Sequence, residues 1–218
     1  AWVLNDPYRG GTHLPDITVI SPLFHDDELV GFAASRAHHA DVGAKEPGSM
    51  PADSHTLADE GLVIPPTRLT SEVLHDLAGR MRNPPQREAD LRAQLAAGRA
   101  GAERVDALIR RFGLDTVRTG MRETLDYAER RTRARIAELE DGVHEARDVL
   151  EAPGDIDLEL HVRATVAGDQ ITLDFTGSAG QHEGNLNCPL PVTLSACYFG
   201  LRVLTDPDVP PCAGAYRP

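Results

Sequence analysis

The sequence of 218 residues has few cysteines and no long hydrophobic run. Its three cysteines, Cys188, Cys197 and Cys212, are odd in number and form no Cys-x-x-Cys pair. We therefore expect no disulfide framework, and we expect the protein to be in the reducing environment of the cytoplasm. No stretch approaches the roughly 20 apolar residues that a membrane-spanning helix needs.

Positive charge is also scarce. The chain has 22 Lys and Arg against 34 Asp and Glu, which gives a net charge of −12. A surface this negative repels the phosphates of nucleic acids and of anionic lipids. We therefore expect neither a nucleic-acid partner nor a membrane partner. The 41% hydrophobic content is that of an ordinary globular protein.

The two ends of the sequence resemble cut ends. Strand-like residues follow Ala1 directly, and the chain stops at Pro218 without a polar tail. We expect the sequence to be an internal piece of a larger subunit.

The hydrophobic pattern predicts an α+β fold in three parts. Residues 1–69 are expected to be rich in β-strands, because apolar runs at 17–20 and 29–33 flank a polar turn. The near-continuous runs predict strands that are buried on both faces. A long loop rich in glycine and proline, at 40–66, follows the strands and is expected to be functional.

Residues 70–150 form the second part, a helical hairpin. Apolar residues recur three or four positions apart up to Phe112, Gly113 interrupts them, and a second series runs to Leu139. The third part, residues 151–218, is expected to contain a β-hairpin near 156–176, where apolar and polar residues alternate. A buried helix is expected at 190–204, which is apolar on almost every side.

Two short segments combine histidine with aspartate. The first ends with His13 and Asp16, and the second contains His38, His39 and Asp41. Neutral imidazole and carboxylate suit Zn²⁺, Mn²⁺ or Fe²⁺. In a strand His39 and Asp41 would share a face, whereas in a helical turn His38 and Asp41 would do so, and the sequence leaves both open.

These five residues predict a site for one divalent metal ion. We expect three or four of them to bind it, with His13 and Asp41 ranked first and Asp16 next. One of His38 and His39 would bind, and the other would orient a ligand or the substrate.

Two other interpretations of these residues remain open. The histidines can be loop residues that hydrogen-bond to the backbone. Alternatively, a histidine is a general base that an aspartate orients, with His39 and Asp41 as the catalytic candidates. No GxSxG nucleophile motif accompanies them. Neither GxxxxGK[ST] nor GxGxxG occurs, so this chain is not expected to bind ATP.

Longer motifs around these residues resemble a known family. The chain reads NDPYRGGTHLPD at 5–16, RAHHADVG at 36–43 and PGSM at 47–50. These motifs resemble the hydantoinase B/oxoprolinase family, and the resemblance extends through DLRAQ at 90–94 to AGAYRP at 213–218. Ala44 and Cys212 depart from the family pattern, which usually has glycine and asparagine there.

The resemblance implies the metal-binding subunit of an ATP-dependent amidohydrolase of the 5-oxoprolinase or N-methylhydantoinase type. Such an enzyme opens a cyclic amide, for example 5-oxoproline, a hydantoin or another lactam. A hydantoinase A-type subunit or domain would use the ATP within a hetero-oligomer. Two alternatives remain: a subunit of an ATP-dependent ketone carboxylase, similar to those for acetone and acetophenone, or an inactive structural or interaction fragment.

Overall fold

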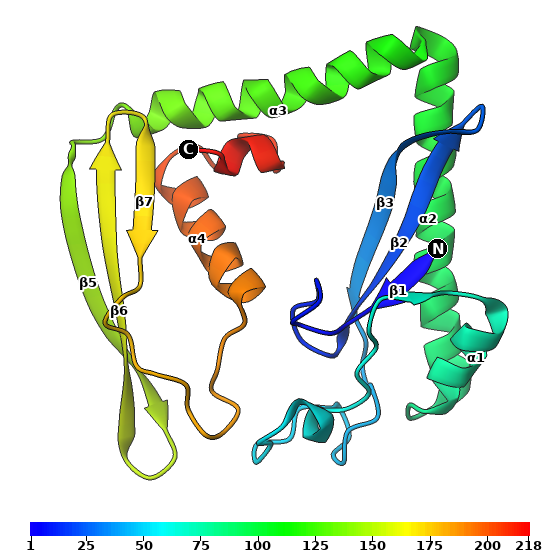
Figure 1. The fold of residues 1–218 in the computed structure, drawn as a ribbon, viewed down its shortest axis with the longest axis horizontal. Helices are drawn as coiled ribbons and strands as arrows, with labels where there is room; N and C mark the ends of the chain where they lie inside the picture. The colour runs from blue at the N-terminus through cyan, green and yellow to red at the C-terminus, as the bar shows by residue number, and fades with distance from the viewer. The chain divides into compact units, whose positions relative to one another are not determined.

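The computed structural model describes all residues from 1 to 218 and contains four α-helices and two antiparallel sheets, so the predicted α+β class is confirmed. The chain divides into two compact units (Figure 1). Unit 1 comprises Ala1–Gly113, Glu183–Asn185 and Pro189–Pro191, and unit 2 comprises the remainder. The boundary at Gly113 falls inside the region that the sequence assigns to a single helical part, so each unit is described by itself.

Unit 1 is built on a four-stranded antiparallel sheet. Its strands lie in the order β3-β2-β1-β4, and their bounds are β1 Trp2–Leu4, β2 Asp16–His25, β3 Glu28–His38 and β4 Thr67–Arg68. The two strands predicted around a polar turn are confirmed as β2 and β3, which pair as a hairpin. Its turn places Asp26 and Asp27 at positive φ, a conformation that aspartate tolerates better than most residues.

Two helices complete unit 1: α1, Ser71–Gly79, and α2, Pro84–Phe112. Gly113 ends α2 with a positive φ of 84°, as the sequence predicts. α2 lies across β2 and β3 at close range. A Cβ atom on Gly98 would lie only 2.8 Å from Ser21 Oγ, and one on Gly101 would lie 3.5 Å from Ala33 Cβ.

The core of unit 1 lies where the sheet, α1 and α2 meet. Its buried members are Val3, Leu14, Ile17, Val19, Val42, Ile64, Leu74, Leu77, Met81 and Leu91. The prediction that the strands are buried on both faces is wrong for β3. α2 covers only one face of the hairpin, and on β3 Phe32 remains 63% exposed.

Unit 2 contains the second sheet and two helices. The sheet has the order β5-β6-β7, with β5 Gly142–Ala152, β6 Ile156–Ala167 and β7 Gln170–Asp174. The predicted hairpin is confirmed as β6 and β7, with Gly168 at positive φ in the turn. β5 was not predicted, because its glutamates, arginine and alanines do not alternate with apolar residues.

The helices of unit 2 correct two predictions. α3, Leu114–Ile136, packs on β7 and on the short helix η2, Ala213–Tyr216, whereas α2 packs on β2, β3 and α1. α2 and α3 therefore pack on different elements, each within its own unit. Leu108, Phe112 and Met121, which a helical hairpin would bury, are 47%, 50% and 45% exposed.

α4, Leu190–Leu204, is helical as predicted, but the prediction that it is buried is wrong. Leu190 and Phe199 are 70% and 72% exposed. Apolar residues lie on all sides of α4, but other elements of the chain cover only part of its surface. Tyr198 stacks on Tyr216 of η2 at 3.9 Å between ring centroids. No helix in the chain is both long enough and apolar enough to span a membrane.

Candidate metal centre

Three of the five predicted metal ligands meet at one end of the sheet in unit 1. Asp16 is the first residue of β2 and His38 is the last residue of β3, and the two are register partners. His13 precedes β2 in a turn closed by a hydrogen bond from Asp16 N to His13 O of 3.0 Å. One candidate ligand atom from each of the three lies within 4.8 Å of the others. We call His13, Asp16 and His38 the His/Asp cluster.

The Asp16 carboxylate is the centre of the His/Asp cluster. Its Oδ2 lies 2.7 Å from His13 Nδ1 and accepts a hydrogen bond of 2.7 Å from Thr12 Oγ1, and its Oδ1 lies 3.3 Å from His38 Nδ1. Burial alone would raise the pKa of Asp16, but the hydrogen bond from Thr12 and the interactions with the two histidines outweigh burial and lower it. The carboxylate is therefore ionised at neutral pH.

The loop before β2 presents His13 through unusual backbone geometry. Gly10 has a positive φ of 102°. A Cβ atom on Gly11 would lie 2.2 Å from the carbonyl oxygen of Asn5, so only glycine fits. The Asn5 side chain is fully buried and donates to Leu14 O at 2.8 Å. These contacts fix the turn, as expected from the two glycines that precede Thr12 and His13.

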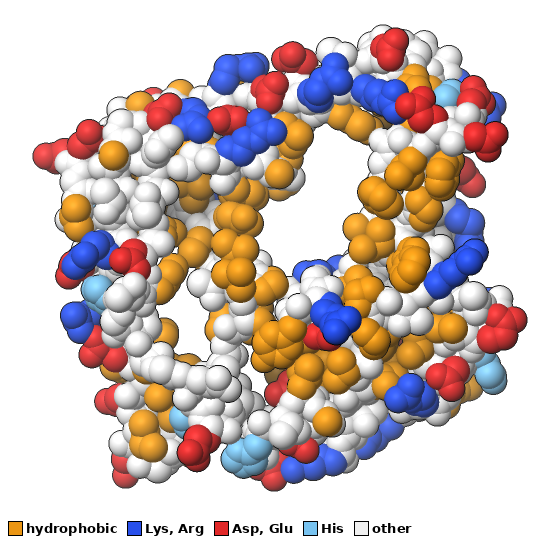
Figure 2. Space-filling view, viewed as in Figure 1, with side chains coloured by type: hydrophobic (Ala, Val, Ile, Leu, Met, Phe, Trp, Pro, Cys, Tyr) orange, Lys and Arg blue, Asp and Glu red, His pale blue; other side chains and the backbone are white.

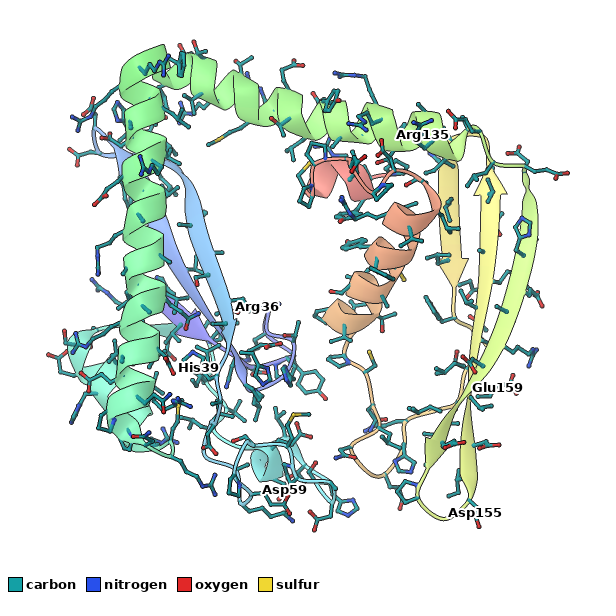
Figure 3. All side chains as sticks on the ribbon, turned by 180° about the vertical axis from the view of Figure 1, so that it is seen from behind. Arg36, His39, Asp59, Arg135, Asp155 and Glu159 are labelled. Carbon is teal, nitrogen blue, oxygen red and sulfur yellow. The ribbon has the colours of Figure 1, made fainter.

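His39 faces α2 instead of joining the His/Asp cluster (Figure 3). Its Nε2 lies 3.0 Å from Gln94 Oε1. The Gln94 amide nitrogen already donates to Ile17 O at 2.9 Å and to Ser35 O at 3.1 Å, so Gln94 Oε1 is the acceptor and His39 Nε2 the donor. Burial lowers the pKa of His39, which keeps the ring neutral. The His39–Gln94 pair thus ties α2 to both strands that carry the cluster.

Asp41, ranked first with His13, also lies outside the His/Asp cluster. Its carboxylate accepts hydrogen bonds from Gly43 N at 2.8 Å, Gly48 N at 3.0 Å and Arg82 Nη1 at 2.8 Å. Burial opposes the charge, but these donors outweigh it and lower the pKa of Asp41. The carboxylate therefore holds the 40–66 loop against the segment before α2.

The family model for hydantoinase B/oxoprolinase matches residues 1–218. The chain belongs to the hydantoinase B/oxoprolinase family. Among its relatives, a 5-oxoprolinase of Dictyostelium discoideum is 32% identical over 225 residues, which cover 98% of this chain and 18% of that protein.

Two solved structures share the fold of this family member. The ATP-dependent caprolactamase from Pseudomonas jessenii superposes with a TM-score of 0.91 at 28% identity, over 99% of this chain and 38% of that chain. A nucleotide-free acetone carboxylase superposes with a TM-score of 0.86 at 22% identity, over 98% of this chain and 31% of that chain, and this similarity shows a common fold alone. The present chain spans only 18% to 40% of the length of the curated relatives that it matches.

Proposed function

We propose that this hydantoinase B/oxoprolinase family member supplies the metal site of an ATP-dependent enzyme that hydrolyses a cyclic amide. The observation that carries the proposal is the His/Asp cluster, in which a charged carboxylate lies between two imidazoles. The caprolactamase and the 5-oxoprolinase among the similar proteins support the reaction class.

The donor set of the His/Asp cluster fits a divalent ion. Two imidazoles and one carboxylate, with no thiolate, suit Zn²⁺, Mn²⁺ or Fe²⁺. Three protein ligands leave coordination positions for water or substrate, which distinguishes a catalytic site from a closed structural one. His13, Asp16 and His38 would hold the ion, and when bound it would acidify a coordinated water and polarise a carbonyl oxygen.

The residues around the His/Asp cluster have distinct tasks in this proposal. Thr12 holds the Asp16 carboxylate in place through its hydroxyl. Partners of this kind fix the orientation of a metal ligand and strengthen metal binding. His39 is a positioning residue, because its hydrogen bond to Gln94 holds the backbone next to His38 against α2. The general-base alternative is less well supported, because Gln94 and not Asp41 accepts the hydrogen bond from His39.

We further propose that ATP binds to a hydantoinase A-type subunit or domain, in the cytoplasm. The present sequence has no phosphate-loop motif, and it spans a minor part of its relatives. Amide resonance makes attack by water slow. Phosphorylation of the amide oxygen by ATP, with release of ADP, removes that resonance and makes the carbon reactive towards water. Water adds to the carbon, the ring C–N bond breaks as the nitrogen takes up a proton, and a second water releases the phosphoryl group of the resulting acyl phosphate as inorganic phosphate.

The proposal predicts that turnover of the full-length enzyme with its partner depends on metal. Removal of the ion with a chelator should abolish ATP hydrolysis that depends on 5-oxoproline, a hydantoin or caprolactam, and Zn²⁺, Mn²⁺ or Fe²⁺ should restore it. Full turnover in chelated enzyme would contradict the metal role. Bicarbonate-dependent consumption of a ketone would assign the carboxylase function instead, and inactivity in every assay would favour a structural role.

A further inference from the structure

The His/Asp cluster lies on the face of the sheet that α2 does not cover. α2 approaches Ser21 and Ala33, which are register partners, so it lies on the side of the odd-numbered residues of β3 near Ala33. Side chains alternate along a strand. Ala34, Arg36 and His38 therefore share the open face with Asp16.

The open face changes in character with distance from the His/Asp cluster. The row next to Asp16 and His38 contains Thr18 and Arg36, and the row beyond it contains Trp2, Ile20 and Ala34. Trp2 is 50% exposed. Figure 2 shows hydrophobic side chains gathered over β2 and β3 on this face. The row of Arg36 and Thr18 thus lies between the His/Asp cluster and an apolar surface.

Two hydrogen bonds hold the Arg36 guanidinium in place. Nε donates to Thr18 Oγ1 at 2.8 Å, and Nη2 donates to the carbonyl oxygen of Gly10 at 2.9 Å. Both acceptors are neutral, and no aspartate or glutamate forms an ion pair with this guanidinium. The side chain is exposed, so its remaining N–H donors on Nη1 and Nη2 are available to a ligand.

We propose that Arg36 binds an oxyanion group of the substrate next to the metal site. This inference rests on the proposed function and specifies its substrate class: a cyclic amide that carries a carboxylate on its ring, or that carries a phosphoryl group on its amide oxygen during the reaction. Arg36 and His38 are two residues apart on one face, which corresponds to about 7 Å along a strand. A small ring with one anionic substituent spans such a distance.

The chemistry of the guanidinium supports an anionic ligand. A guanidinium offers planar, paired N–H donors that match the two oxygens of a carboxylate or phosphoryl group. Because Arg36 is already held by Thr18 and Gly10, less side-chain freedom is lost on binding. The adjacent apolar side chains of Trp2 and Ile20 suit the methylene groups of a ring.

Arg36 also tethers Gly10 and hence the loop that carries His13, so the test must separate binding from tethering. Arg36→Gln removes the charge but keeps an amide NH2 group whose two N–H donors can replace a hydrogen bond to Thr18 or Gly10. Arg36→Lys keeps the charge but removes the fork of donors. Arg99→Gln is the matched control, because Arg99 is an exposed arginine of α2 in the same unit and forms no ion pair.

In the full-length enzyme with its partner, Arg36→Gln should lower kcat/KM for 5-oxoproline about 10- to 100-fold, as expected for a lost charge-assisted hydrogen bond. Metal occupancy and Tm should match those of the wild type. If the anion is the ring carboxylate, KM for uncharged caprolactam stays unchanged, and calorimetry without ATP shows weaker binding of 5-oxoproline. If the anion is the phosphoryl group, both substrates lose kcat and inorganic phosphate inhibits less.

Arg36→Lys should recover part of the loss in either case. Unchanged kinetics and unchanged phosphate inhibition in Arg36→Gln would overturn the assignment. A lower metal content or a lower Tm that parallels the loss of turnover would also overturn the assignment. It would show that Arg36 only tethers the loop that carries His13. A wild-type enzyme that is inactive on every cyclic amide would instead count against the proposed function.

Discussion

Replacement of Asp16 by asparagine should remove bound metal and turnover together while leaving unit 1 folded. The amide is neutral and still accepts the hydrogen bond from Thr12, so the turn before β2 persists. Loss of the only carboxylate in the His/Asp cluster should weaken metal binding by more than about 100-fold, because even residues that merely hydrogen-bond to a ligand contribute about 10- to 100-fold. Metal content after dialysis and steady-state turnover measure the effect.

The control for Asp16→Asn is another aspartate that is hydrogen-bonded to a histidine in the same unit. Asp106 lies 3.0 Å from His25, far from the His/Asp cluster in sequence and fold. Asp106→Asn should keep full metal content. Equal metal content in Asp16→Asn and the wild type would rule out Asp16 as a ligand.

Asp41→Ala should instead destabilise unit 1 by about 2–4 kcal/mol, because it removes a buried charged acceptor and leaves its donors unpaired. The Asp41 side chain is 8% exposed, and it accepts from Gly43, Gly48 and Arg82. The free energy of unfolding in urea measures the loss. Any loss of metal should follow the fraction of unfolded protein.

Asp53 in the same loop is the matched control for Asp41. Its side chain is 70% exposed and pairs with Lys45 in solvent, so Asp53→Ala should leave the free energy of unfolding almost unchanged. Acidification gives a second check. Because the pKa of folded Asp41 is lowered, its stabilisation is present above its ordinary pKa of 3.8 and disappears as the pH falls through the lowered value. The wild type and Asp41→Ala should therefore converge in stability at strongly acidic pH. A metal-free but fully stable Asp41→Ala would contradict this role.

The sequence alone could locate the parts of the site but not their pairing. Imidazole and carboxylate at His13, Asp16 and His38 indicate metal chemistry by residue type, and the loop between them predicts a turn. The adjacency of Asp16 and His38 depends on the register of β2 and β3, which the turn at Asp26 and Asp27 sets. A shift by one residue would place His39 beside Asp16 instead.

The role of Asp41 could not be predicted, because its charged partner is distant in sequence. Arg82 is 41 positions away, in the segment between α1 and α2. The same holds for His39 and Gln94, which are 55 positions apart. Spacing within a motif shows which side chains can share a face, but not which distant residue forms a hydrogen bond with each of them.

The fold was predictable where periodicity was clear and not where it was mixed. The strands β2 and β3 follow from two apolar runs around a polar turn, and the β6–β7 hairpin follows from alternation. The end of α2 follows from the helix-breaking Gly113. β5 has no alternation, and its pairing with β6 decides its conformation. The apolar composition of α4 predicts a helix, whereas its burial depends on contacts that the composition does not specify.

The most direct test of the His/Asp cluster is anomalous diffraction from crystals of the full-length enzyme at the absorption edge of its bound metal. We expect one anomalous peak bonded to His13, Asp16 and His38, at about 2.0–2.2 Å from each ligand atom, and none beside Asp41 or His39. An ion bound to Asp41 or His39, or a metal-replete enzyme with no ion at the His/Asp cluster, would contradict the proposed site.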